Sequence, residues 1–161
     1  MKRQMILIAA FALMLLSCEQ RPINVTIEDA LPPIYPDYTG VTIPVDIAPL
    51  NYCVDGAERM DVVVTGSKCG EIIANGKYAD FDINEWKELV SDNVGGELTF
   101  LTSVKREGRW TQYRPFAIHV SDDSLSDFGV VYRKLAPGYE TFSHIGIYQR
   151  DIHTFDEYPI V

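Results

Sequence analysis

Short runs of branched apolar residues, separated by turn-forming dipeptides, constrain the fold of this chain more than any other feature. The first four runs cover residues 41–45, 50–54, 61–65 and 71–74, with Asp55-Gly56 and Asn75-Gly76 among the turns. Runs of this kind between Asp-Gly and Asn-Gly turns are typical of β-hairpins and meanders. This part of the chain therefore predicts antiparallel sheet.

The second half of the chain predicts further strands. Residues 97–105 alternate between apolar and polar, with Leu98, Phe100, Thr102 and Val104 on one side. Glu107-Gly108-Arg109 then predicts a turn into a strand over 110–120, which makes a long hairpin with its apolar face on the core. Two more strands are expected over 128–135 and 142–152.

A single short helix interrupts the strand pattern. Ile83, Trp86, Leu89 and Val90 recur at helical spacing, after Asp82 or Asn84 as N-cap and before Gly95-Gly96 as terminator. Eight or nine short strands and one helix predict an all-β, mainly antiparallel fold over residues 40–161. We expect an immunoglobulin-like β-sandwich.

The first eighteen residues have the order of a secretory signal. Lys2 and Arg3 precede an apolar run over 5–16, which is followed by Ser17 and Cys18. Twelve apolar residues lie within the roughly 7–15 of a signal peptide's apolar region. They fall well short of the roughly 20 that a membrane-spanning helix needs.

Leu15-Leu16-Ser17-Cys18 resembles the lipobox of bacterial lipoproteins. The resemblance implies cleavage after residue 17, diacylglycerol on the Cys18 thiol and an acyl chain such as palmitate on the new amino terminus. Two or more acyl chains give stable membrane anchoring. The alternative is an ordinary secretory signal with an incidental cysteine. Glu19 is not the Asp that retains enteric lipoproteins at the inner membrane, so we expect the outer membrane, at its periplasmic or surface face.

The predicted domain boundaries follow from the assignment of a lipoprotein signal peptide. Residues 1–17 are the predicted signal peptide, and the Pro-rich segment 18–39 is a predicted tether, because Pro fixes φ and removes a backbone donor. The later part of that segment, over 34–38, has the alternative of packing on the fold. Residues 40–161 are the predicted β-sandwich domain.

The charge of the chain restricts its partners. The formal net charge is −9, and removal of Lys2 and Arg3 with the signal leaves 12 basic against 23 acidic residues, or −11. Nucleic acids and anionic lipid surfaces are bound through Lys and Arg that neutralise phosphates. We therefore expect no nucleic-acid partner, and membrane contact through the lipid anchor alone.

Two further cysteines, Cys53 and Cys69, remain once Cys18 is assigned to lipid. Export would place them where disulfides persist. Their spacing is compatible either with a disulfide or with two buried free thiols. The chain has no C-x-x-C pair, which disfavours a zinc ribbon or a redox motif.

No signature of catalysis or of a metal site is present in the sequence. It has no G-x-S-x-G elbow, and Ser121, Ser124 and Ser126 lie in an acidic loop where Ser and Asp usually cap turns. His119, His144 and His153 are far apart, and residues 122–127 lack the Gly and Glu of an EF-hand loop. We therefore expect no enzyme, no cofactor and no metal site.

Glycan binding is a further alternative, because exposed aromatic rings stack on sugar faces. The candidates are Trp86, Trp110, Tyr113, Tyr139 and Tyr148. Trp86 lies on the helix face that should meet the sheet, and Trp110 opens a predicted core strand. Core packing is therefore the favoured interpretation of both.

Several segments resemble a known family: Ile34-Tyr35-Pro36-Asp37-Tyr38-Thr39-Gly40, Trp110-Thr111-Gln112-Tyr113-Arg114-Pro115-Phe116, Val131-Tyr132-Arg133, Pro137-Gly138-Tyr139-Glu140 and Ile147-Tyr148-Gln149-Arg150. They are similar to the amino-terminal domain of exported lipoproteins that continue into a TolB-like β-propeller. The cysteine-rich segment and propeller repeats of that family are missing here, so we expect a truncated copy. The resemblance carries over no catalytic residue.

Charged residues in the last strands suggest structural ion pairs. We expect Arg133, Glu140, Arg150 and Glu157 to pair within or beside the sheet and to fix strand register. The sequence thus predicts a membrane-anchored cell-envelope lipoprotein with a non-enzymatic interaction or scaffold domain and envelope proteins as partners. The alternative is a surface lipoprotein that binds a glycan or another ligand.

Overall fold

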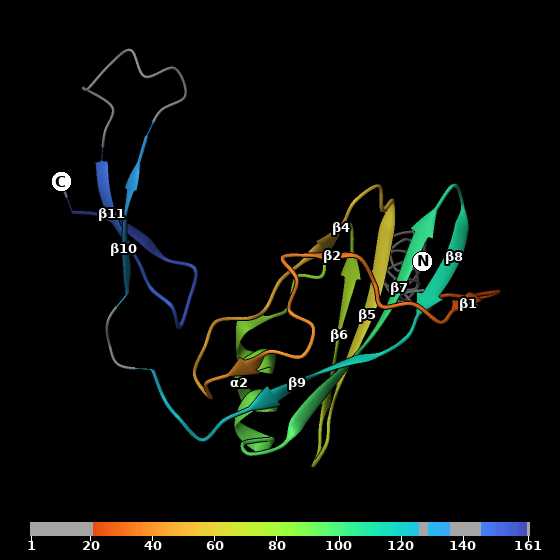
Figure 1. Ribbon diagram of the computed structural model, residues 1–161, viewed down its shortest axis with the longest axis horizontal. Helices are drawn as coiled ribbons and strands as arrows, with labels where there is room; N and C mark the ends of the chain where they lie inside the picture. The colour runs from red at the N-terminus through yellow and green to blue at the C-terminus, as the bar shows by residue number, and fades with distance from the viewer. Residues whose placement is uncertain (1–20, 126–128, 136–145, 161) are drawn as a thin grey trace, which may run out of the picture.

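The protein is described here by a computed structural model over residues 21–125, 129–135 and 146–160 (Figure 1). Its main body is a seven-stranded sheet in which β1, β8, β7, β5 and β6 lie in that order, while β9 also pairs with β7 and β3 pairs with β9. The strands are β1 (Thr26–Glu28), β3 (Thr42–Ile43), β5 (Arg59–Gly66), β6 (Glu71–Gly76), β7 (Glu97–Arg106), β8 (Arg109–Tyr113) and β9 (Phe116–Val120).

Two smaller sheets and a helix complete the fold. β2 (Ile34–Tyr35) pairs with β4 (Cys53–Val54), and the helix α2 (Ile83–Asp92) packs on one face of the large sheet. A three-stranded sheet of β10 (Val130–Lys134), β11 (Gly146–Arg150) and β12 (Glu157–Pro159) stands to one side of this body in Figure 1.

Strand β7 lies at the centre of the large sheet and confirms the predicted hairpin. Leu98, Phe100, Thr102 and Val104 are buried on one face, as their alternation predicts. Glu107 and Gly108 form the turn into β8 with φ of 49° and 75°, a region in which Gly is unstrained. The position of the turn and the apolar alternation of β7 are therefore both consistent with the observed pairing of β7 with β8.

The predicted continuous strand over 110–120 is wrong in one respect, because it is broken into β8 and β9. Ser103 faces Gln112 and Phe100 faces Phe116, so the two residues of β7 between these pairs oppose three residues on the other strand. This is the geometry of a β-bulge. Pro115 has no N–H to donate, and the Arg114 N–H donates to the carbonyl of Ala30 instead.

The predicted tether over 18–39 is also wrong for much of its described part, which begins at residue 21. β1 runs parallel to β8, β2 pairs with β4, and Ile34 is buried in the core. The alternative, in which residues 34–38 pack on the fold, is confirmed for Ile34. The prolines of this segment lie outside β1 and β2, where they interrupt no ladder hydrogen bond.

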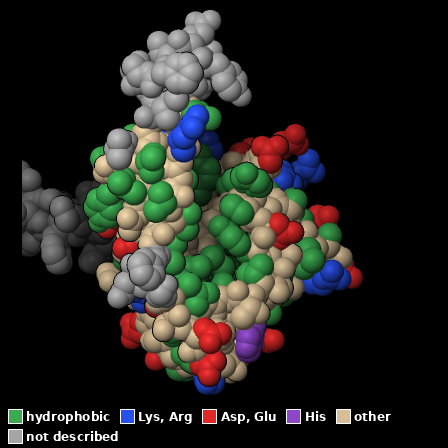
Figure 2. All heavy atoms as spheres, turned by 60° about the vertical axis from the view of Figure 1, so that its left-hand side comes forward, with side chains coloured by type: hydrophobic (Ala, Val, Ile, Leu, Met, Phe, Trp, Pro, Cys, Tyr) green, Lys and Arg blue, Asp and Glu red, His purple; other side chains and the backbone are tan. Residues whose placement is uncertain are grey.

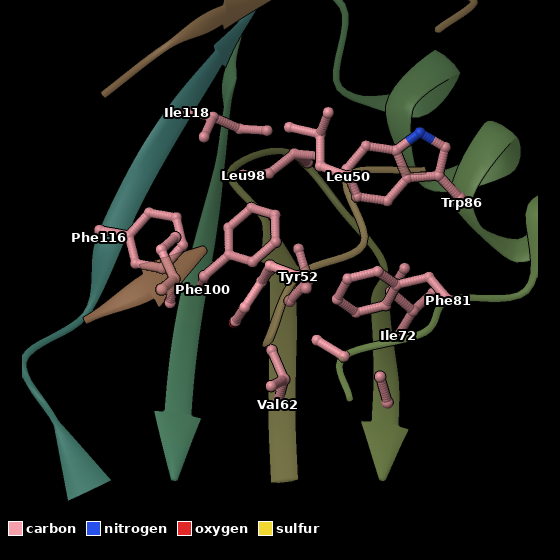
Figure 3. Close-up of a cluster of buried hydrophobic side chains, with 14 of the residues drawn as sticks. Leu50, Tyr52, Val62, Ile72, Phe81, Trp86, Leu98, Phe100, Phe116 and Ile118 are labelled. Carbon is pink, nitrogen blue, oxygen red and sulfur yellow. The ribbon is translucent and has the colours of Figure 1, made fainter. Parts of the chain in front are cut away.

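The core lies between the large sheet and α2, and aromatic rings fill its centre (Figure 3). The Phe100 ring stacks on Phe116 at 4.9 Å between centroids, and the rings of Phe81, Tyr52 and Trp86 lie 6.2–6.4 Å away. Separations of this size are favourable for aromatic pairs.

The short helix confirms its sequence prediction. The Asp82 carboxylate caps α2 by accepting from the backbone N–H groups of Asn84 and Glu85. Trp86, Leu89 and Val90 form its buried face. The helix extends to Asp92, nearly three turns rather than two.

The described residues thus form a mostly β fold with one short helix, as predicted. The immunoglobulin-like sandwich is not confirmed. The elements that face the large sheet across the core are α2, the two-stranded β2–β4 sheet and irregular chain.

A buried asparagine joins the β5–β6 turn to the end of α2. Asn93 is fully buried, and its side-chain Oδ1 accepts from the Lys68 N–H at 2.8 Å. Its Nδ2 donates to the carbonyls of Cys69 and Leu89. A Cβ at Gly66 would lie 2.2 Å from that Nδ2, so only glycine fits beside the amide.

Truncation of the central ring should destabilise the whole domain. Replacing Phe100 by Ala removes contacts with four other rings, and we expect a loss of about 3–5 kcal/mol in the free energy of unfolding. Chemical denaturation followed by circular dichroism measures this loss. Thr99→Ala, at the exposed neighbouring position, is the control and should change stability by less than about 1 kcal/mol.

Candidate interaction surface

The three-stranded sheet is an antiparallel meander whose register separates its side chains onto two faces. Tyr132 lies opposite Tyr148, and Tyr148 lies opposite Pro159. Their neighbours in the chain, Val131 and Tyr158, both lie opposite Gln149. Because successive side chains of a strand point to opposite faces, these two sets belong to different surfaces.

One face is held together by aromatic and charged side chains. The rings of Tyr132 and Tyr148 are 6.4 Å apart, and the Lys134 ammonium lies 4.4 Å from the centre of the Tyr148 ring. The Glu157 carboxylate accepts from the Tyr132 hydroxyl and pairs with Lys134. These contacts link all three strands.

The other face is apolar and exposed, and we call it the apolar face. Its large side chains are between 40% and 58% exposed: Val131, Leu135, Ile147, Tyr158 and Ile160. Arg133 and Gln149 lie among them by the same register. Single exposed apolar residues need no explanation, but five on one face of one small sheet are typical of an interaction site.

Figure 2 turns the part of the molecule that holds the three-stranded sheet toward the viewer. Hydrophobic side chains gather on the three-stranded sheet and around a hollow beside it. Within the described part of the chain, β10 has β11 as its only neighbour. Its second edge therefore presents backbone N–H and C=O groups that can pair with another strand.

A histidine flanked by two carboxylates joins this sheet to the main body. The His153 ring lies 3.3 Å from Asp46 through Nε2 and 3.1 Å from Asp151 through Nδ1. Asp46 also accepts from the Leu125 N–H, and the Ala48 N–H donates to the Ile152 carbonyl. The loop around Asp46 thus connects the three-stranded sheet to the main body through these contacts.

The backbone of His153 also acts on the neighbouring acid. Its N–H donates to the Asp151 carboxylate, and this bond, with smaller contributions from the ring, holds the pKa of that carboxyl below its ordinary value. Hydrogen bonds to the charged form of an acid favour that form. Asp151 is therefore fully ionised near neutral pH.

The predicted ion pairs are corrected in part. Glu157 does take part in a cross-strand pair, but its partner is Lys134. No described residue forms an ion pair with Arg133 or Arg150, and the Arg150 guanidinium lies 5.7 Å from the centre of the Phe155 ring instead. Glu140 lies outside the described residues, as does the predicted lipidation site Cys18.

The disulfide alternative for Cys53 and Cys69 is not realised, because both are free thiols. Cys53 lies in β4 near the start of β5, whereas Cys69 lies in the turn at the far end of that strand. Eight residues of strand span about 25 Å, far beyond the roughly 7 Å that a disulfide allows between Cα atoms. Cys69 is exposed rather than buried.

The aromatic candidates for glycan binding are distributed over different parts of the molecule. Trp86 is fully buried and donates to the Ile47 carbonyl, which confirms core packing, and Tyr113 is buried as well. Trp110 and Tyr148 are partly buried, and Tyr139 lies outside the described residues.

The histidines and the acidic loop also have structural surroundings. His119 is exposed on β9, and His144 lies outside the described residues. Ser121 accepts from the Asp123 N–H, as expected of a turn. Among the described residues, no group of three or more His, Cys, Asp or Glu side chains could hold a metal ion.

The sequence alone predicts neither the apolar face nor the contact between His153 and Asp46. Val130 and Val131 are adjacent and identical, so hydropathy alone does not predict which of them lies on the apolar face. His153 and Asp46 are too far apart in the chain for any spacing rule to connect them.

No protein-family model matches the chain, and a search among curated proteins found no match. Within the described residues, no helix combines the length and the apolar character needed to cross a membrane.

The turn that contains His153 should depend on pH through Asp151. Its lowered pKa means that its favourable contact with His153 is present above the ordinary pKa of about 3.8 and is lost as the pH falls through the lower, folded value. A carbon-detected NMR titration should place the Asp151 midpoint below 3.8 in the folded protein, and at the ordinary value in denaturant. A folded midpoint at or above the ordinary value would contradict this assignment.

Proposed function

We propose that this chain is a membrane-anchored cell-envelope lipoprotein whose β-rich domain is a non-enzymatic interaction or scaffold module. The observation that carries the proposal is the apolar face of the three-stranded sheet, with Val131, Ile147 and Tyr158 at its centre. Burial of apolar side chains is the main favourable contribution to most protein–protein association. The partner that fits is the apolar surface of another exported protein.

The size of this face indicates how a partner would bind. The three strands lie about 4.8 Å apart, and the two longer ones have five residues and the third has three, so the sheet covers at most roughly 14 by 16 Å. That is far less than the roughly 800 Å² per partner of a standard interface. A partner strand added along the open edge of β10 would extend the apolar face and supply backbone hydrogen bonds.

The anchor and the charge support the same proposal. A lipid on Cys18 would hold the domain at a membrane, and the acidic composition would keep its surface off anionic headgroups. The apolar face would then be displayed to proteins rather than inserted into lipid. Since the family that the mature region resembles carries a TolB-like β-propeller, a β-rich module of that kind is our candidate partner.

Two adjacent valines provide a test of whether a partner binds at the apolar face. Val131 is on the apolar face and Val130 is on the opposite face, with exposed fractions of 58% and 55%. With a photo-crosslinking amino acid at Ile147 in cells, we expect an adduct with a defined envelope protein. Val131→Gln should abolish the adduct and Val130→Gln should leave it intact.

Two results with these variants would argue against docking at the apolar face. Loss of the adduct in both variants, with both still folded by circular dichroism, would show that the sheet as a whole and not the apolar face is required. An adduct that is insensitive to Val131→Gln would contradict docking on this face.

The anchor is tested by metabolic labelling with an alkyne fatty acid. The full-length chain should take up the label, and Cys18→Ser should lose it because the acceptor thiol is gone. Cys53→Ser, which removes a free thiol inside the domain, should remain labelled. Persistent label on Cys18→Ser would contradict the lipoprotein assignment.

A further inference from the structure

A second candidate site is a small groove on the main body, separate from the apolar face. The end of β2, the start of β4 and the segment after β6 form it, and the bridge between Tyr52 and Ala79 holds the last two together. It has a volume of about 360 Å³ and is lined by Tyr35, Pro36, Asn51, Cys53, Tyr78 and Asp80. This volume is at the small end of the range of ligand pockets.

Two exposed tyrosines give the groove its character. Tyr35 is 75% exposed and Tyr78 is 55% exposed, although both line the groove and are large aromatic residues. Pro36, Cys53 and Ala79 add apolar surface between them. Exposed tyrosines beside an apolar depression offer flat faces for stacking at a low cost in side-chain entropy.

The rim of the groove has a fixed pair of polar groups. The Asn51 Nδ2 donates to Asp80 Oδ1 at 2.7 Å, and the Asn51 Oδ1 accepts from the Phe81 N–H at 3.0 Å. These two bonds determine the orientation of the amide. An amide has two N–H donors and a carboxylate has two oxygens, so one N–H of Asn51 and Oδ2 of Asp80 have no partner among the described residues.

We propose that this groove binds a neutral saccharide through one pyranose ring with equatorial hydroxyls. The two faces of such a ring are made of C–H groups and would stack on Tyr35 and Tyr78. Of two neighbouring hydroxyls, one would donate to Asp80 and the other would accept from Asn51. The formal charge of −9 disfavours an anionic sugar.

The saccharide fits this groove better than a proline-rich peptide does. Both ligands use aromatic walls, but a polyproline helix presents mainly backbone carbonyls, which can accept but not donate hydrogen bonds. Asp80, when ionised, only accepts hydrogen bonds. A hydroxyl pair matches both the acceptor of Asp80 and the donor of Asn51.

The test is a titration of the full-length chain, purified in a detergent without a sugar headgroup. Cellotetraose and chitotetraose are the probes, and ligand-observed NMR with isothermal titration calorimetry is the measurement. Binding of either probe supports the proposal, and a preference for chitotetraose would assign a subsite to the acetamido group. Tyr35→Ala and Tyr78→Ala should each weaken binding by at least about tenfold.

The controls separate stacking from loss of structure. Tyr35→Phe and Tyr78→Phe keep the ring and should bind as the wild type does. Tyr158→Ala removes an equally exposed tyrosine of the apolar face and should also leave the affinity unchanged. Asp80→Leu should abolish binding, because its acceptor is lost.

Three outcomes would overturn the proposal. These are no binding of either probe at millimolar concentration, equal weakening by Tyr158→Ala and Tyr78→Ala, or binding of a polyproline peptide in place of both saccharides. None of them bears on docking at the apolar face, which the valine pair tests independently.

Discussion

The stack of Phe100 on Phe116 is the contact on which the rest of the structure depends. Rings from three other segments meet this pair: Tyr52 before β4, Phe81 before α2, and Trp86 within α2. Among the described residues, one short helix, the two-stranded β2–β4 sheet and irregular chain cover this face of the large sheet, so the rings supply much of what a full second sheet supplies in a sandwich. Two of the three segments that line the groove, around Tyr52 and before Phe81, are positioned by this cluster.

The bulge between β8 and β9 separates the two places where strands of the amino-terminal part of the chain pair with the large sheet. It divides one edge of the sheet into two, and β1 and β3 each run parallel to one part. After β3, the chain continues into the loop around Asp46, where the Val45 N–H donates to the Asp123 carbonyl. The strand that pairs with β9 beyond the bulge thus leads directly into the loop that contacts the three-stranded sheet.

The features that the sequence predicts correctly are those with local causes. Asp82 caps α2 through its own neighbours, and the alternation of β7 places Phe100 inward without reference to any other strand. The features that it predicts wrongly depend on partners far away in the chain. The break at Pro115 requires Ala30 to accept from Arg114, and the pairing of Glu157 with Lys134 rather than an arginine requires the register of three strands. The apolar face and the groove arise in the same way, from residues that no local pattern connects.

An isolated three-stranded sheet is only marginally stable in water unless one face is packed. Here Glu157, Tyr132, Tyr148 and Lys134 form contacts that span the strands on one face, and the His153 junction holds the sheet to the main body. These contacts keep the strands in register while Val131 and Ile147 stay exposed. A partner that binds an already ordered sheet loses less free energy to ordering than one that must fold it. The polar face thus allows the apolar side chains to stay exposed without loss of strand register.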